Sequence, residues 1–112
     1  MLIRYTRAAL LLALCSACSA PPEPITVNDG TVSVLNRTES AWHDVIVTVN
    51  DHFRGGTALL QPGGRLTAPL SQFQTAHGQK FSLARQSPYK IEVTATDATG
   101  RPVALAWGHT RP

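Results

Sequence analysis

The stretch Asp44–Asn50 (DVIVTVN) decides the fold class of this 112-residue chain. Val45, Val47 and Val49 alternate with an isoleucine and a threonine, so the valines share one face and the other two side chains share the opposite face. Successive side chains of an extended strand point to opposite faces, and β-branched residues favour that conformation. The stretch therefore predicts a β-strand with its valine face in a core.

Similar short segments occur on both sides of this stretch, separated by turn-forming residues. The clear ones are Thr31–Asn36, Lys90–Thr96 and Pro102–Trp107, and the weaker ones are Gly56–Leu60, Arg65–Leu70 and Gln79–Ala84. Turns are expected at Asn50-Asp51, Pro62–Gly64 and Asp97–Gly100, and Gly55-Gly56 indicates a bulge or an edge strand. Roughly six or seven short strands at this spacing predict an all-β fold, a small antiparallel β-sandwich. Over residues 29–112 the pattern resembles the immunoglobulin-like and fibronectin-like sandwiches of bacterial envelope proteins.

The N-terminal residues have a different composition from the rest. Arg4 and Arg7 precede the unbroken apolar run Ala8–Leu14 (AALLLAL), and small residues follow it. A basic start, a short apolar segment and small residues are the three parts of a secretory signal. The run is shorter than the roughly 20 residues that a membrane span requires. We therefore expect a helical signal peptide over residues 1–17.

The end of this signal, Leu14–Ser19 (LCSACS), resembles the lipobox of bacterial lipoproteins. That resemblance implies diacylglycerol on the thiol of Cys18 and cleavage before it, with Cys15 in a position where the family usually has leucine. It also implies that Ser19, which is not aspartate, directs the protein to the outer membrane, facing the periplasm. The alternative is ordinary cleavage after Ala20, which would give a secreted or soluble periplasmic protein.

A proline-rich tether is expected between the signal and the domain, over residues 18–28, because Pro21, Pro22 and Pro24 favour extended backbone. The domain is then residues 29–112. Without residues 1–17 the chain keeps 8 basic and 7 acidic residues, so the net charge of +3 falls to +1. The basic residues are scattered, which argues against nucleic acid as a partner.

Residues for chemistry are sparse in the predicted domain. None of the four histidines, His43, His52, His77 and His109, has a spacing typical of metal ligands. No serine lies in a nucleophile-elbow motif, and no glycine-rich loop has the lysine and helix that phosphate binding requires. We therefore expect neither an enzyme nor a metal site nor a cofactor.

Aromatic residues are the best functional candidates, because large aromatics are common both in cores and in binding surfaces. Trp42, Phe73 and Tyr89 form a candidate binding patch, and Trp42 alternatively closes the end of the sandwich. The expected function is a non-catalytic binding or structural module that is attached to a membrane by its lipid and contacts an envelope protein. The alternatives are a module that binds an envelope glycan or small molecule, and a periplasmic metal-handling protein.

Overall fold

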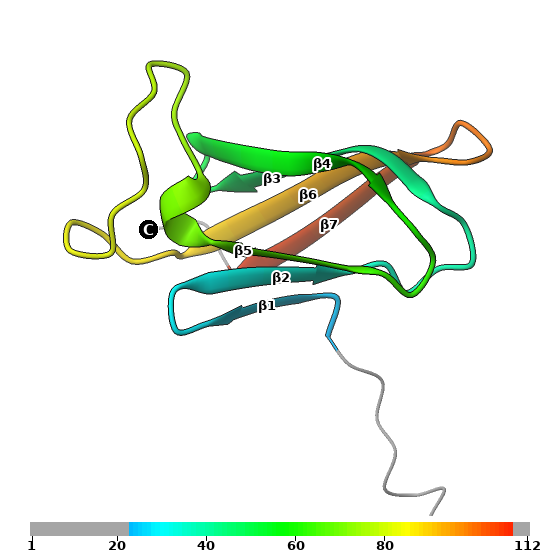
Figure 1. The fold of residues 1–112 in the computed structure, drawn as a ribbon, viewed down its shortest axis with the longest axis horizontal. Coiled ribbons are helices and arrows are strands. Elements are labelled where there is room, and N and C mark those ends of the chain that lie inside the picture. The colour runs from blue at the N-terminus through cyan, green and yellow to red at the C-terminus, as the bar shows by residue number, and fades with distance from the viewer. Residues whose placement is uncertain (1–22, 109–112) are drawn as a thin grey trace, which may run out of the picture.

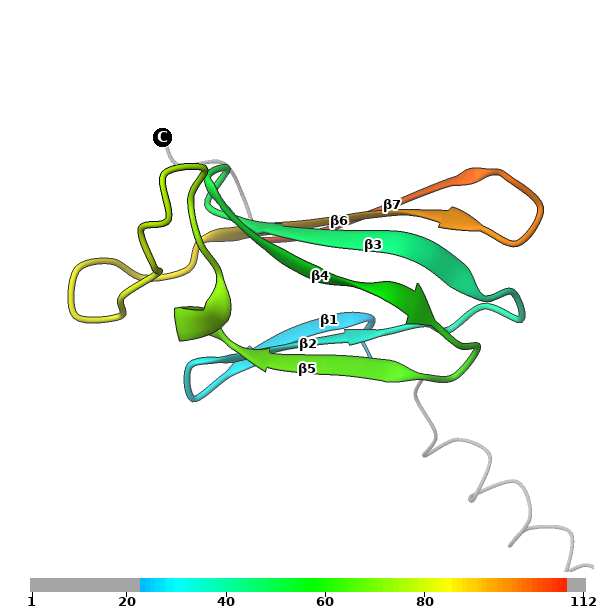
Figure 2. The ribbon, with the colours of Figure 1, turned by 45° about the horizontal axis from the view of Figure 1, so that its top comes forward.

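The protein is a sandwich of two antiparallel β-sheets, seen in a computed structural model that describes residues 23–108. One sheet has the strand order β1-β2-β5 and the other β4-β3-β6-β7 (Figures 1 and 2). The elements are β1 (Ile25–Asn28), β2 (Thr31–Leu35), β3 (Trp42–Val49), β4 (Phe53–Leu60), β5 (Arg65–Pro69), the 3-10 helix η1 (Leu70–Gln72), β6 (Lys90–Asp97) and β7 (Pro102–Gly108). This confirms the small antiparallel β-sandwich and its strand number.

The core lies between the two sheets and is built by the predicted alternation. In β3, Val45, Val47 and Val49 are buried, whereas Ile46 between them is 43% exposed. The other buried apolar side chains are Ile25, Val32, Val34, Trp42, Phe53, Leu60, Leu70, Phe73, Phe81, Ile91, Val93 and Ala95. Burying each large apolar side chain stabilises the fold by about 1.5–3 kcal/mol, so this layer holds the sheets together.

A β-bulge near the start of β3 changes which residues face the core. Asp44 has a φ of +52°, and the pairing of β3 with β6 shifts by one residue between His43 and Ile46. An extra residue in one strand reverses the alternation beyond it. Trp42 and Val45 therefore both point inward although they are three residues apart. Beside the bulge, the carbonyl oxygen of Val45 lies where the side chain of residue 56 would begin, so only glycine fits at Gly56.

The first strand begins before the predicted domain boundary at residue 29. Residues 25–28 form β1, which pairs with β2 through the turn at Asp29-Gly30, and Ile25 is buried in the core. The β-branched residues of Ile25–Asn28 alternate as in the other strands, so the domain begins before residue 29. The weak strand candidate Gln79–Ala84 was also wrong, because only Lys80 forms an isolated bridge there.

Two buried asparagines fasten the two ends of the sandwich. Asn36 is fully buried: its Nδ2 donates to the carbonyl oxygens of Ser40 and Leu60, at 2.9 and 3.0 Å, and its Oδ1 accepts from the backbone N–H and the hydroxyl of Thr38, at 2.9 and 2.6 Å. Asn50 donates to the carbonyl of Ser87 and accepts from the N–H of Tyr89. Both side chains supply partners to loop backbone that would otherwise be unpaired.

The hairpin that joins β6 and β7 confirms the turn predicted at Asp97–Gly100. Gly100 has a φ of +88°, and the carboxylate of Asp97 accepts hydrogen bonds from the Thr99 hydroxyl at 2.7 Å and from the N–H of Arg101 at 3.0 Å. The hydrogen bond from the Thr99 hydroxyl, followed by that from the Arg101 N–H, holds the pKa of the exposed Asp97 below its ordinary value.

Candidate functional site

The predicted aromatic patch is not a surface in the structure. Trp42 and Phe73 are each 2% exposed and belong to the core, and Tyr89 is half-buried beside Asn50. Trp42 therefore closes the end of the sandwich, the alternative to an exposed binding role. The two rings are inward-facing because the bulge at Asp44 turns Trp42 into the core and the loop after η1 folds Phe73 beneath β4. Cys18 lies outside the described residues.

The loop after η1 closes the opposite end of the sandwich with aromatic rings. A side chain at Gly55 would meet the ring of Phe73, so the glycine allows this close approach. Phe81 meets Phe53 edge to face, with ring centroids 5.1 Å apart. Burial of these rings, rather than regular secondary structure, holds residues 73–89 in place.

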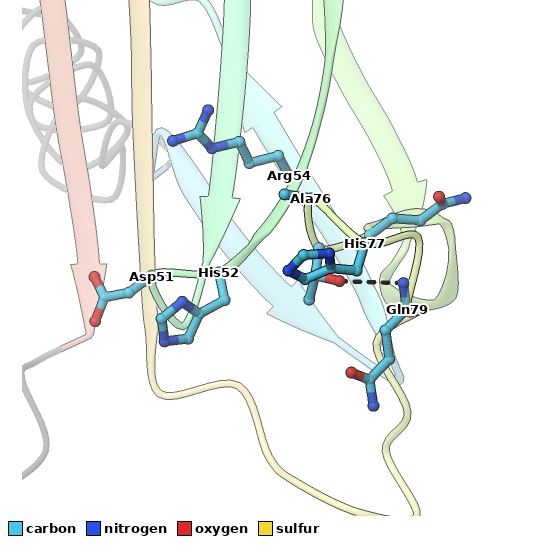
Figure 3. A pocket seen from close by; sticks show the side chains of 8 residues that line it. Asp51, His52, Arg54, Ala76, His77 and Gln79 are labelled. Atoms are coloured by element: carbon cyan, nitrogen blue, oxygen red, sulfur yellow. Dashed lines mark hydrogen bonds between the residues drawn. The ribbon is translucent and has the colours of Figure 1, made fainter.

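A polar cavity of about 570 Å³ lies between this loop and the β3–β4 turn (Figure 3). Its walls are Asp51, His52, Arg54, Gln74, Thr75, Ala76, His77 and Gln79. The hydroxyl of Thr75 accepts a hydrogen bond from the N–H of Gln79, which shapes the hairpin that carries His77. In Figure 3 the imidazoles of His52 and His77 border the cavity from its two sides, while the side chain of Arg54 extends away from His77.

One charged group at the edge of this cavity, Asp51, is engaged in an ion pair. The carboxylate of Asp51 pairs with the ammonium of Lys90 at 2.9 Å, and this hydrogen bond raises the pKa of Lys90. Among residues 23–108, no group of three or more His, Cys, Asp or Glu side chains lies close enough together to hold a metal ion. The cavity offers amide, hydroxyl and imidazole groups suited to hydrogen bonding with a polar ligand.

The second candidate site is the free edge of β4. Arg54 exchanges both backbone hydrogen bonds with Gln74, at 2.8 and 3.2 Å, on the side away from β3. Backbone groups of a strand alternate in direction, so the N–H and C=O of Gly56 and Ala58 point to the same side. Within the described part of the chain, β4 pairs only with β3 and with Gln74, so these groups are available to another strand.

The other three edge strands carry features that discourage pairing. β1 has only four residues and follows Pro24, β5 ends with Pro69, and β7 begins with Pro102. Short edges and prolines are devices by which proteins prevent edge-to-edge association. β4 has eight residues and no proline, and its one charged residue, Arg54, stands where Gln74 already covers the edge.

An apolar groove of about 640 Å³ follows this free edge on the outer face of the sheet. It is lined by Asp44, Val45, Ile46, Arg54, Gly55, Gly56, Thr57 and Ala58. Ile46 and Leu59 are each 43% exposed, so large apolar side chains reach solvent on two neighbouring strands. The residues Gly55-Gly56 were predicted to mark a bulge or an edge, and the edge is confirmed; the groove was not predicted, because it depends on the bulge at Asp44.

Comparisons with protein-family models, with curated proteins and with solved structures found no match. The immunoglobulin-like resemblance of the strand pattern therefore stays an expectation beyond the sandwich itself. Residues 23–108 contain no helix with the length and apolar character needed to cross a membrane.

Proposed function

We propose that this chain is an envelope lipoprotein, attached to the outer membrane through a lipid on Cys18 and facing the periplasm. Its sandwich acts as a non-catalytic binding module that accepts an extended strand of a protein partner at the free edge of β4. The uncovered backbone at Gly56 and Ala58, on an edge without proline or free charge, is the observation that carries the binding role. The anchor rests on the signal and lipobox resemblance of the sequence.

Strand addition suits this edge because it would pair the outward backbone N–H and C=O groups of β4 in the same way as an interior strand pairs its own. An incoming strand would exchange backbone hydrogen bonds with Gly56 and Ala58, each worth about 0.5–1.5 kcal/mol net. Its outward side chains would lie in the groove beside Ile46 and Leu59, which adds apolar burial. Attachment of module and partner to the same membrane would raise their effective concentration.

The test places a photo-crosslinking side chain at Ala58 in the full chain and activates it in intact cells. Ala104 is the matched control, because it is also an exposed alanine and lies on the outer face of β7. We expect a discrete protein adduct from position 58 and none from position 104. Equal crosslinking at both positions, or none at position 58, would contradict the proposal.

A second candidate function is the binding of a small polar molecule in the cavity between His52 and His77. The polar lining of this cavity favours it, whereas the burial of Trp42 removes an aromatic platform from the glycan alternative. Nuclear magnetic resonance of the full chain in detergent, titrated with envelope sugars, would test it. Shifts confined to residues 74–79 and the β3–β4 turn would support this function, and unchanged spectra would exclude these ligands.

A further inference from the structure

We infer that the open side of the sandwich between β1 and β7 binds a short uncharged glycan, which lies against the indole ring of Trp107. β1 and β7 are edge strands of the two sheets and lie near each other along one side of the sandwich (Figures 1 and 2). β7 and β4 are the opposite edges of the four-stranded sheet, so this site is separate from the proposed strand-binding edge. The inference therefore goes beyond the proposed function and does not depend on it.

A groove of about 520 Å³ follows this open side of the sandwich. Its volume lies within the range of about 300–1,000 Å³ that is typical of small-molecule sites. One wall consists of Glu23 and the whole of β1, and the other consists of residues 106–108 at the end of β7. A strand of four residues extends about 13 Å, at about 3.3 Å per residue, so the groove suits an elongated ligand.

Trp107 gives this groove an aromatic surface that the core uses only in part. It pairs with the fully buried Ile91 of β6, and its ring packs against the core but remains half-buried. Its indole N–H has no hydrogen-bond partner within residues 23–108 and, unlike that of Trp42, is not enclosed. The side chain therefore offers an apolar ring together with a free donor. A sugar ring is divided in the same way, because C–H groups cover its faces and hydroxyl groups surround its rim.

The polar side chains of the groove are available to bind hydroxyl groups. Glu23, Thr26 and Asn28 line it, and their side chains make no hydrogen bond or ion pair with the rest of the described chain. A carboxylate accepts hydrogen bonds, whereas a hydroxyl and a carboxamide both donate and accept them, so together they suit sugar hydroxyls. Glu23 is the one charged residue among the described residues that line the groove, so it would repel carboxylate or phosphate groups. The groove therefore favours an uncharged glycan over an acidic one.

The two tryptophans of the chain give a direct test by nuclear magnetic resonance, since each has one indole N–H signal. The purified full chain, in a detergent without a sugar headgroup, is titrated with the tetramers of glucose and of N-acetylglucosamine. The tetramer of galacturonic acid is the charged comparison. We expect an uncharged tetramer to shift the indole signal of Trp107 and to leave that of the buried Trp42 unchanged. The variant Trp107→Phe, which has no indole N–H, identifies the signal.

Variants on β1 and before it test the polar contacts without removing the tryptophan. Asn28→Ala and Glu23→Ala should each weaken binding of the uncharged tetramer by about 2- to 10-fold, with circular dichroism confirming that the fold is kept. Glu39→Ala is the matched control, because Glu39 is also exposed but lies outside the groove, and it should bind as the parent does.

Three results would overturn the glycan site. They are an unchanged Trp107 signal with both uncharged tetramers, tighter binding of the galacturonic acid tetramer, and an equal loss of binding in Glu39→Ala and Glu23→Ala. Shifts confined to residues 74–79 and the β3–β4 turn would also overturn it, and would favour the cavity between His52 and His77. The photo-adduct at position 58 tests the strand-binding edge independently, so failure of one proposal leaves the other standing.

Discussion

Removing the carboxamide of Asn36 should be the most damaging change to a polar residue outside the strands. Asn36→Ala leaves the Leu60 carbonyl buried without its donor, which costs about 1–3 kcal/mol. The bonds to Ser40 and Thr38 are partly exposed, so water replaces them and their loss costs about 0.5–1 kcal/mol each. These three weaker bonds and the Leu60 bond together give an expected loss of about 2.5–6 kcal/mol, a large share of the stability of a small domain.

Urea denaturation of the full chain, followed by tryptophan fluorescence, measures this loss. Asn28→Ala is the matched control: Asn28 is exposed at the end of β1, so its removal should change the stability by less than about 0.5 kcal/mol. Asn36→Asp keeps the shape but turns a donor into an acceptor that faces two carbonyls, so it should destabilise more at pH 7 than at pH 4, where protonation restores a donor. If the alanine variants of residues 36 and 28 had the same free energy of unfolding, the buried hydrogen bonds of Asn36 would not contribute to stability.

Four further predictions concern separate parts of the chain. Gly56→Ala should cost at least about 2 kcal/mol in urea denaturation, because the new methyl group would overlap a neighbouring backbone carbonyl. Phe73→Ala should cost about 3–5 kcal/mol, and a loss of partner binding without a loss of stability would contradict its place in the core. Because the pKa of Asp97 is lower in the folded than in the unfolded chain, its ionised carboxylate stabilises the fold above the unfolded pKa of about 3.9. This stabilisation is lost as the pH falls through the lowered folded pKa. The difference in unfolding free energy between the parent and Asp97→Asn should therefore shrink below about pH 4. Cys18→Ser should move the chain from the membrane to the soluble fraction or leave it unprocessed, and mass spectrometry of the mature N-terminus would distinguish an acylated Cys18 from a cut after residue 20.

The strands were predictable where alternation and turn residues agree, as in Asp44–Asn50 and Lys90–Thr96. The inward position of Trp42 was not, because it depends on a single aspartate with positive φ, and many aspartates occur in strands and turns without forming a bulge. The loop that carries Phe73 has no hydrophobic periodicity from which its buried rings could be predicted. These rings are held by contacts with residues far away in the chain. Predicting that β4 has a free edge requires the order of the strands in the sheet, and the local sequence pattern does not contain that order.

The two glycines of β4 have structural roles that are independent of binding. Gly55 makes room for the ring of Phe73, and Gly56 accommodates the Val45 carbonyl at the bulge. Their lack of side chains is therefore explained by the fold, and the evidence for a binding edge narrows to the segment Thr57–Leu60. Ala58 is exposed, so a lysine there would protect the edge at little cost in stability. The other three edge strands are short or have a proline at one end, whereas β4 lacks any such protection although a lysine there would not harm the fold. A strand-pairing function explains this difference, and stability alone does not.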